Sequence, residues 1–194
     1  DSTLFLALEM QHSGIETYVF FEKDFYIRNH GDLKLNVHKF SGEVDSETYY
    51  LKSFSIIEDV EIMPSERDTF HMRLDPPFDT RYLRFLWMFG FIEKCGAKII
   101  NSPEGILRNN EKIMAYEHPC SLKSYVGSSF ETFDSFCNEL RNDGHNNLII
   151  KPLDLYQGIG VQKISLTDTN LELIFECAIE EFMGPIVAQP FYEG

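Results

Sequence analysis

The spacing of apolar and polar residues divides the chain into helices and strands. Apolar residues at helical spacing predict a first helix that ends at Gly14, and the apolar run at 15–21 predicts a strand. Residues 25–37 hold two alternating runs on either side of positions 29–32, so they predict a β-hairpin. Residues 41–67 are polar and weakly periodic, and we expect surface loops with one helical turn there.

The middle of the chain predicts a strand, a helix and a second strand in succession. The two strands occupy 68–73 and 97–101, and the helix between them occupies 80–96. This order and spacing are typical of a parallel crossover unit. A short helical turn then begins at Pro103, and another helix begins near Asn110.

The pattern of apolar and polar residues changes in the last third of the chain. From Ser121 the pattern predicts a strand, a helix at 130–143, a strand at 146–151, a glycine loop, a strand at 160–166, a helix at 169–182 and a strand at 185–191. The preceding helix gives way at 116–120, which we take as a domain boundary. We therefore expect an α/β protein of two small domains, residues 1–117 and 118–194.

Composition limits the classes of function. The 194 residues are 43% apolar with a mean hydropathy of −0.22, and no apolar run approaches the roughly 20 residues that span a bilayer. A net charge of −14 argues against a nucleic-acid-binding face, which needs clustered Lys and Arg. The four cysteines form no CxxC unit, so we expect buried or idle thiols in a reducing, cytoplasmic protein. The six histidines lack metal-binding spacing, which argues against a metal site built from them.

Two places carry candidate chemistry on residue types alone. Arg73 ends a predicted strand, where open α/β sheets bind ligands, and Pro76 and Pro77 fix the backbone beyond Asp75. The alternative is a plain strand-to-helix loop in which Asp79 or Thr80 caps the helix and Arg73 makes a surface pair with an aspartate.

The second place combines two lysines and a loop. Lys112 begins a helix near the domain boundary, and Lys151 ends an apolar strand, where an ammonium suits a phosphate oxygen. Gly158 and Gly160 follow in a loop that could bring backbone N–H groups close to an anion. The alternative is a snorkelling lysine before an ordinary hairpin, since neither a Walker loop nor GxGxxG occurs.

Four short motifs, in order, resemble the prokaryotic glutathione synthetases of the ATP-grasp superfamily. The chain has Arg-Leu-Asp-Pro-Pro-Phe-Asp at 73–79, Asn-Glu-Lys at 110–112, Lys-Pro-Leu-Asp at 151–154 and Ala-Gln at 188–189. The resemblance implies a Rossmann-like pre-ATP-grasp domain followed by the α+β lid subdomain of an ATP-grasp fold. It also implies a magnesium-dependent ligase that uses ATP to join γ-glutamylcysteine to glycine through an acyl phosphate, and it suggests a homo-oligomer.

The resemblance also implies roles for individual residues. Lys112 and Lys151 would bind ATP phosphates, the loop with Gly158 and Gly160 would close over them, and Arg73 with Asp75 would meet the acidic dipeptide. The adenine pocket would be lined by Gln189, Pro190, Phe191 and Tyr192. We expect the magnesium ligands beyond residue 194, the first strand of the fold to be missing, and this stretch to be inactive alone.

Two departures from the family pattern keep other functions open. Leu74 stands where the family has lysine, and Leu155 and Gln157 stand where it has glycines. Another ATP-grasp carboxylate–amine ligase with a different amine acceptor is one alternative. A non-catalytic relative that binds a nucleotide is the other.

Overall fold

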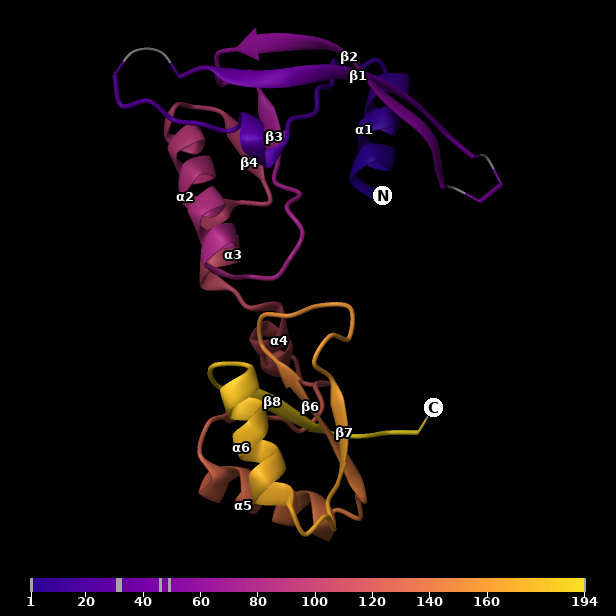
Figure 1. The fold of residues 1–194 in the computed structure, drawn as a ribbon, viewed down its shortest axis with the longest axis vertical. Coiled ribbons are helices and arrows are strands. Elements are labelled where there is room, and N and C mark those ends of the chain that lie inside the picture. The colour runs from indigo at the N-terminus through magenta and orange to yellow at the C-terminus, as the bar shows by residue number, and fades with distance from the viewer. Residues whose placement is uncertain (1, 31–32, 46, 49, 194) are drawn as a thin grey trace. The chain divides into compact units, whose positions relative to one another are not determined.

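The computed structural model describes residues 2–30, 33–45, 47–48 and 50–193 (Figure 1). The chain divides into two units, the first built from residues 1–73 and 84–104 and the second from 74–83 and 105–194. Each unit is described by itself below. The domain boundary expected between residues 117 and 118 stays a prediction.

The first unit contains most of the predicted helices and strands of the first half of the chain. In chain order, the elements up to residue 108 are α1 (Ser2–His12), η1 (Glu22–Asp24), β1 (Leu35–Val44), β2 (Leu51–Ile62), β3 (Thr69–His71), α2 (Thr80–Lys94), β4 (Lys98–Ile100) and α3 (Pro103–Arg108). β3 and β4 pair in parallel with α2 between them in the chain, which confirms the predicted crossover unit. Leu86, Phe89 and Ile92 recur every third residue of α2 and are buried.

A long antiparallel hairpin, β1 with β2, corrects two predictions. Residues 41–67 were expected to be loops, yet β2 pairs with β1 over almost its whole length. The hairpin expected at 25–37 is wrong as well, since its second half belongs to β1, and Gly31 and Asp32 of its turn lie outside the described residues. β2 has no buried residue, so no apolar alternation marks it in the sequence.

The strand expected at 15–21 is also wrong. Only Val19 pairs with the hairpin, by two backbone hydrogen bonds of 3.0 and 2.7 Å with His38. The chain then forms the short 3₁₀ helix η1, so the apolar run does not continue as a strand paired with β1. Its aromatic residues pack instead, with Phe20 against Phe25, Phe70 and Phe89.

His38 joins the hairpin to η1 through two carboxylates. Its Nδ1 lies 2.7 Å from Asp59 Oδ1 and its Nε2 lies 2.9 Å from Asp24 Oδ2, while the imidazole side chain is only 9% exposed. Both ring nitrogens face acceptors, which suits the doubly protonated ring. The hydrogen bond to Asp24 raises the pKa of His38, with burial opposing it and Asp59 adding to it.

This arrangement predicts a pH-dependent stability of the first unit. The folded pKa lies above the unfolded value of about 6.5, so the stabilisation is complete below that pH and is lost as pH rises through the folded pKa. Urea unfolding followed by Trp87 fluorescence should show this loss in the native chain and a flat profile for His38→Gln over the same interval. Equal pH slopes for the two proteins would contradict the assignment.

The second unit is built around a four-stranded antiparallel sheet, and two of its helices pack on one face of that sheet. Beyond α3, its elements are α4 (Glu111–Met114), η2 (Ala115–Glu117), β5 (Tyr125–Gly127), α5 (Phe130–Asn142), β6 (Asn147–Pro152), β7 (Gln162–Ser165), α6 (Leu171–Glu181) and β8 (Ile186–Pro190). The strand order is β5-β8-β6-β7. The predicted succession of strands and helices from Ser121 onward is confirmed.

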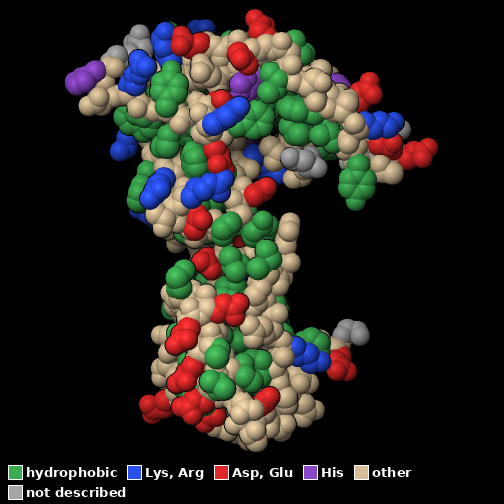
Figure 2. Space-filling model, in the orientation of Figure 1, with side chains coloured by type: hydrophobic (Ala, Val, Ile, Leu, Met, Phe, Trp, Pro, Cys, Tyr) green, Lys and Arg blue, Asp and Glu red, His purple; other side chains and the backbone are tan. Residues whose placement is uncertain are grey.

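Alternation along β6 decides which side chains meet the helices. Leu148 and Ile150 are fully buried in one cluster with Phe133 of α5 and Phe175 of α6. Lys151 therefore belongs to the face of the sheet opposite α5 and α6. The helical side is acidic, because α6 exposes Glu172, Glu176, Glu180 and Glu181, and Figure 2 shows acidic side chains gathered on that side of the unit.

Within the described ranges, no helix combines the length and the apolar character needed to cross a membrane.

Candidate functional site

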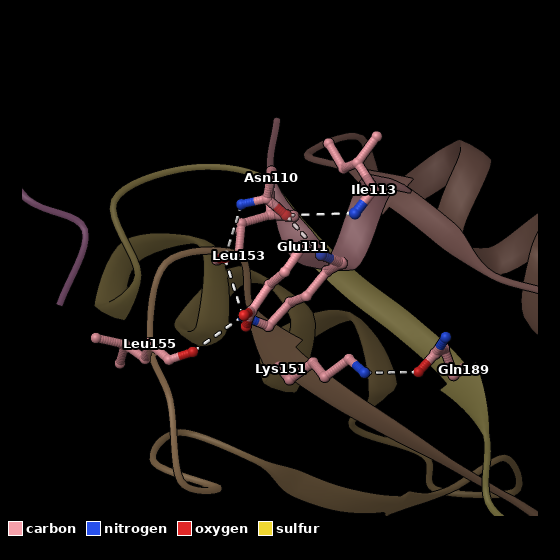
Figure 3. Close-up of polar contacts among 8 residues, drawn as sticks. Asn110, Glu111, Ile113, Lys151, Leu153, Leu155 and Gln189 are labelled. Atoms are coloured by element: carbon pink, nitrogen blue, oxygen red, sulfur yellow. Dashed lines mark hydrogen bonds and ion pairs between the residues drawn. The ribbon is translucent and has the colours of Figure 1, made fainter. Parts of the chain in front are cut away.

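The two candidate lysines lie in the second unit, close enough to influence each other. Lys151 Nζ donates to Gln189 Oε1 at 2.7 Å, so its partner is a neutral amide rather than a carboxylate (Figure 3). Burial lowers the pKa of Lys151, the positive charge of Lys112 lowers it further, and Glu111 opposes both. Two ammonium groups in this arrangement repel each other, and an anion between them would relieve the repulsion.

Lys112 is fixed by backbone oxygens. Its Nζ donates to Leu153 O at 3.0 Å and to Leu155 O at 2.9 Å, and it lies 3.3 Å from the exposed carboxylate of Glu111 (Figure 3). The Lys112 side chain is 15% exposed. Its ammonium therefore sits at the start of the glycine loop, with its stem covered.

Asn110 connects α4 to the same stretch of backbone. Its Oδ1 accepts from the N–H groups of Lys112 and Ile113, which caps the helix, and its Nδ2 donates to Leu153 O at 3.0 Å. Both ends of one amide are thus in use. A single asparagine places the lysine and the loop base relative to each other.

Three of the sequence motifs converge on the segment 153–155. Leu153 and Leu155 accept from the Asn-Glu-Lys motif, and Asp154 O accepts from the backbone N–H of Phe78 at 3.2 Å. Motifs up to about 75 residues apart in the sequence therefore hold one loop base. The sequence gave no sign of this contact, because all three acceptors are backbone carbonyl oxygens, which any residue carries.

The glycine loop itself is a hairpin connection between β6 and β7 made of two tight turns. Ile159 N donates to Tyr156 O at 3.0 Å, and the two central residues, Gln157 and Gly158, have φ of 53° and 78°. Positive φ at both positions is the mark of a type I′ turn. Val161 N then donates to Gly158 O at 3.2 Å, with Gly160 at φ 74°. The loop follows a defined path even though Gln157 stands in a left-handed position.

The two glycines differ in surroundings, which gives a matched pair of variants. A Cβ on Gly160 would lie 2.9 Å from Phe182 Cε1 and 3.1 Å from Pro152 Cδ, whereas one on Gly158 would meet nothing within 4 Å. Both changes to alanine carry the strain of positive φ, about 1 kcal/mol, but Gly160→Ala should cost about 1–3 kcal/mol more through overpacking. Urea unfolding of both variants measures this difference, and equal costs would contradict the packing argument.

The predicted adenine-pocket residues follow along β8 and beyond it. Pro190 ends the strand and is buried, and Phe191 N donates to Asn147 O at 3.0 Å. Lys163 Nζ lies 3.8 Å from the centre of the Phe191 ring, and Tyr192 packs edge-on against His145. Gln189 shares its strand with these residues but is engaged with Lys151.

Arg73 and Asp75 fall in different units. Arg73 donates from its guanidinium to the hydroxyls of Ser2, at 3.1 Å, and Thr3, at 3.4 Å, within the first unit. Asp75 is exposed in the second unit, where Asp79 caps α2 by accepting from the Tyr82 N–H at 2.9 Å. The cap was one of the two interpretations expected for this loop. The substrate roles of Arg73 and Asp75 stay predictions.

Residues that the sequence did not single out also border this site. An open pocket of about 470 Å³ is lined by Ala115, Tyr116, His118, Cys120, Ser121, Leu122 and Gln189. The Tyr116 hydroxyl is buried, and burial raises its pKa, with Ser124 opposing the shift. Ser124 accepts from Gln189 Nε2 at 2.7 Å. A lone serine before a short strand has no sequence pattern that would have identified it.

Two protein families match successive parts of the chain. Residues 1–107 match the N-terminal domain of prokaryotic glutathione synthetase, and residues 111–194 match the ATP-grasp domain of the same enzyme. The chain belongs to the prokaryotic glutathione synthetase family. The resemblance carried by the four motifs is therefore confirmed.

Curated members of the prokaryotic glutathione synthetase family match along much of the chain. Glutathione synthetase of Nitrosomonas europaea is 37% identical over 132 residues, which is 68% of this chain and 40% of that protein. The enzymes of Yersinia pestis and Escherichia coli K12 are 27% and 26% identical over 98% of this chain, which is 57% and 58% of their lengths. The chain thus spans between two fifths and three fifths of these relatives.

Two solved structures share the fold of the chain. Two structures of the ATP-grasp ligase PsnB align over the whole chain and 60% and 62% of their own lengths, with TM-scores of 0.54 and 0.55 at 14% and 13% identity. This likeness concerns the fold alone. It confirms the expected α/β class, with a pre-ATP-grasp domain followed by part of an ATP-grasp fold.

Proposed function

We propose that the protein is an ATP-dependent ligase that joins γ-glutamylcysteine to glycine, and that this chain supplies the phosphate-binding lysines and the lid loop. The observation that carries the proposal is the pair Lys112 and Lys151, two neighbouring cations whose shortest contacts are with neutral oxygens. Membership of the glutathione synthetase family supports the choice of substrates.

The residues fit the phosphate groups of a nucleotide. An ammonium with a lowered pKa, paired with an amide, is available for a phosphate oxygen, and the helical side of the sheet is acidic, which favours the opposite side for an anion. Lys112 would bind at the base of the loop, and the segment with Gly158 and Gly160 would exclude water above the phosphates. Pro190, Phe191 and Tyr192 would line the base pocket beside Gln189.

The chain's own groups would act on charge and position. ATP supplies the phosphoryl group that makes the dipeptide carboxylate reactive toward the glycine amine. Lys112 and Lys151 would stabilise negative charge on the phosphates, and fixed cations of this kind contribute most where water is excluded. Arg73 and Asp75 would bind the acidic dipeptide through its carboxylates and amine. Magnesium is assigned to no residue of the described ranges, in which no cluster of three candidate ligands occurs.

The direct test is phosphate release by the full-length protein. Release that requires ATP, γ-glutamylcysteine and glycine together is the expected result, with glutathione as the product identified by mass. No release above the blank in the presence of all three would remove the proposal. We also propose that the protein is a cytoplasmic homo-oligomer. Light scattering on the same protein sample tests the oligomeric state, and one assembled species at the assay concentration is the expected result.

A different amine acceptor is the second candidate function. Leu74 replaces a family lysine, and the loop holds Gln157 rather than glycine at positive φ. A panel of amino acids offered in place of glycine separates the two functions, since faster release with another amine favours the second. Nucleotide binding without phosphate release in the presence of any of these amines would instead indicate a non-catalytic relative.

A further inference from the structure

A chain of three side-chain hydrogen bonds leads to Lys151 from the start of β5. Ser124 Oγ donates to Leu122 O at 2.8 Å, Gln189 Nε2 donates to Ser124 Oγ at 2.7 Å, and Lys151 Nζ donates to Gln189 Oε1 at 2.7 Å. Figure 3 shows the last of these contacts, between Lys151 and Gln189. The chain crosses β5, β8 and β6, which are neighbours in that order.

The sheet register places these groups side by side. Tyr125 pairs with Ala188, so Ser124, one residue earlier, lies beside Gln189 on β8. Gln189 pairs with Ile149, two residues before Lys151 on the same face of β6. The contacts therefore follow from strand pairing and need no special backbone geometry.

The direction of every bond is set from the Leu122 end. A carbonyl can only accept, so it takes the single hydroxyl proton of Ser124, whose oxygen is left as an acceptor. That acceptor requires the NH₂ end of the Gln189 amide, which leaves the carbonyl end for Lys151. A lysine ammonium has donors only, so the opposite amide orientation would set N–H groups against a cation.

We propose that Ser124 is a positioning residue that fixes the Gln189 amide so that its oxygen faces Lys151 and favours the charged ammonium. Ser124 touches no substrate in this scheme and acts only through Gln189. The charged groups that face Lys151 are Lys112, which disfavours the ammonium, and Glu111, which favours it, and both come from α4. The Gln189 oxygen is the acceptor in direct contact with the ammonium, at 2.7 Å.

The first test needs no nucleotide and so stands apart from the proposed function. The Lys151 ammonium is titrated by NMR in full-length protein carrying labelled lysine, with the signal identified by its loss in Lys151→Arg. Ser124→Ala should lower the pKa of Lys151, because the amide is then free to turn, and Ser124→Thr should restore it. An unchanged Lys151 titration in Ser124→Ala would overturn the proposal.

A double-variant cycle separates positioning from a general structural effect. In a Gln189→Met background, where no amide can turn, Ser124→Ala should leave the titration of Lys151 unchanged. A further fall of the pKa in that background would show that Ser124 acts by another route and would overturn the proposal.

The consequence for nucleotide binding rests on the proposed function. Losing one oriented hydrogen bond beside the phosphate-binding lysine should raise the dissociation constant of ATP about fivefold to tenfold in Ser124→Ala, with Ser124→Thr near the native value. If the NMR arm succeeds and ATP affinity does not change, the orientation of Lys151 stands and its role in nucleotide binding falls.

Discussion

Lys151→Met in the full-length protein is expected to weaken ATP binding about 10- to 100-fold. A charge-assisted hydrogen bond contributes about 1.5–3 kcal/mol, and about 1.4 kcal/mol corresponds to a tenfold change in affinity. Methionine keeps the apolar stem against the strand and removes only the ammonium, so the fold should persist. Calorimetric titration with ATP measures the change.

The same variant should make the second unit slightly more stable. Burial and Lys112 lower the pKa of Lys151, so the folded state disfavours a charge that the unfolded chain carries freely. In the native protein, stability should therefore rise as pH increases from the lowered folded pKa toward the usual value near 10.4. Lost affinity together with gained stability is typical of a residue retained for binding rather than for folding.

Lys123→Met is the matched control for charge. Lys123 is half-exposed and pairs with Asp143 and Glu139 on the surface, so its loss changes the net charge equally but leaves the site intact. Its ATP affinity should equal that of the native protein. If Lys151→Met also bound ATP with native affinity, Lys151 would be an ordinary strand-end lysine with no role in nucleotide binding.

The second unit could be predicted from sequence because one face of its sheet is buried. In β6 the buried Leu148 and Ile150 belong to a short apolar run, and the helices carry apolar residues at helical spacing, so both kinds of element can be recognised in the sequence. β2 has no such face, and backbone pairing with β1 rather than side-chain burial defines it. The prediction therefore failed where the sheet is exposed.

The candidate site divides in a similar way. Lys112, Lys151 and Gly160 could be singled out because charge at a strand end and glycine in a turn are visible in the sequence. The contacts of Lys112 with two leucine carbonyls, and the role of Ser124, depend on strand register, which the sequence leaves open. Gln189 was expected beside the base, and the structure adds its contact with Lys151.

Phe133→Ala should destabilise the second unit by about 3–5 kcal/mol, the usual cost of emptying a phenylalanine site in a core. Phe133 is fully buried, stacks on Phe175 with ring centres 4.6 Å apart and meets Tyr125 edge-on at 5.7 Å. Domains are commonly stable by only about 5–15 kcal/mol, so this one change removes a large share.

The loss should reach the site because Phe133 shares its cluster with Leu148 and Ile150, whose strand carries Lys151 on the other face. Faster amide hydrogen exchange along β6 and β8 measures it at the site itself. Leu173→Ala is the control, since Leu173 is 59% exposed on α6 and its truncation should change stability by no more than about 0.5 kcal/mol. Equal protection of β6 in both variants would mean that the cluster does not support the strand of Lys151, and that ATP affinity should survive Phe133→Ala unchanged.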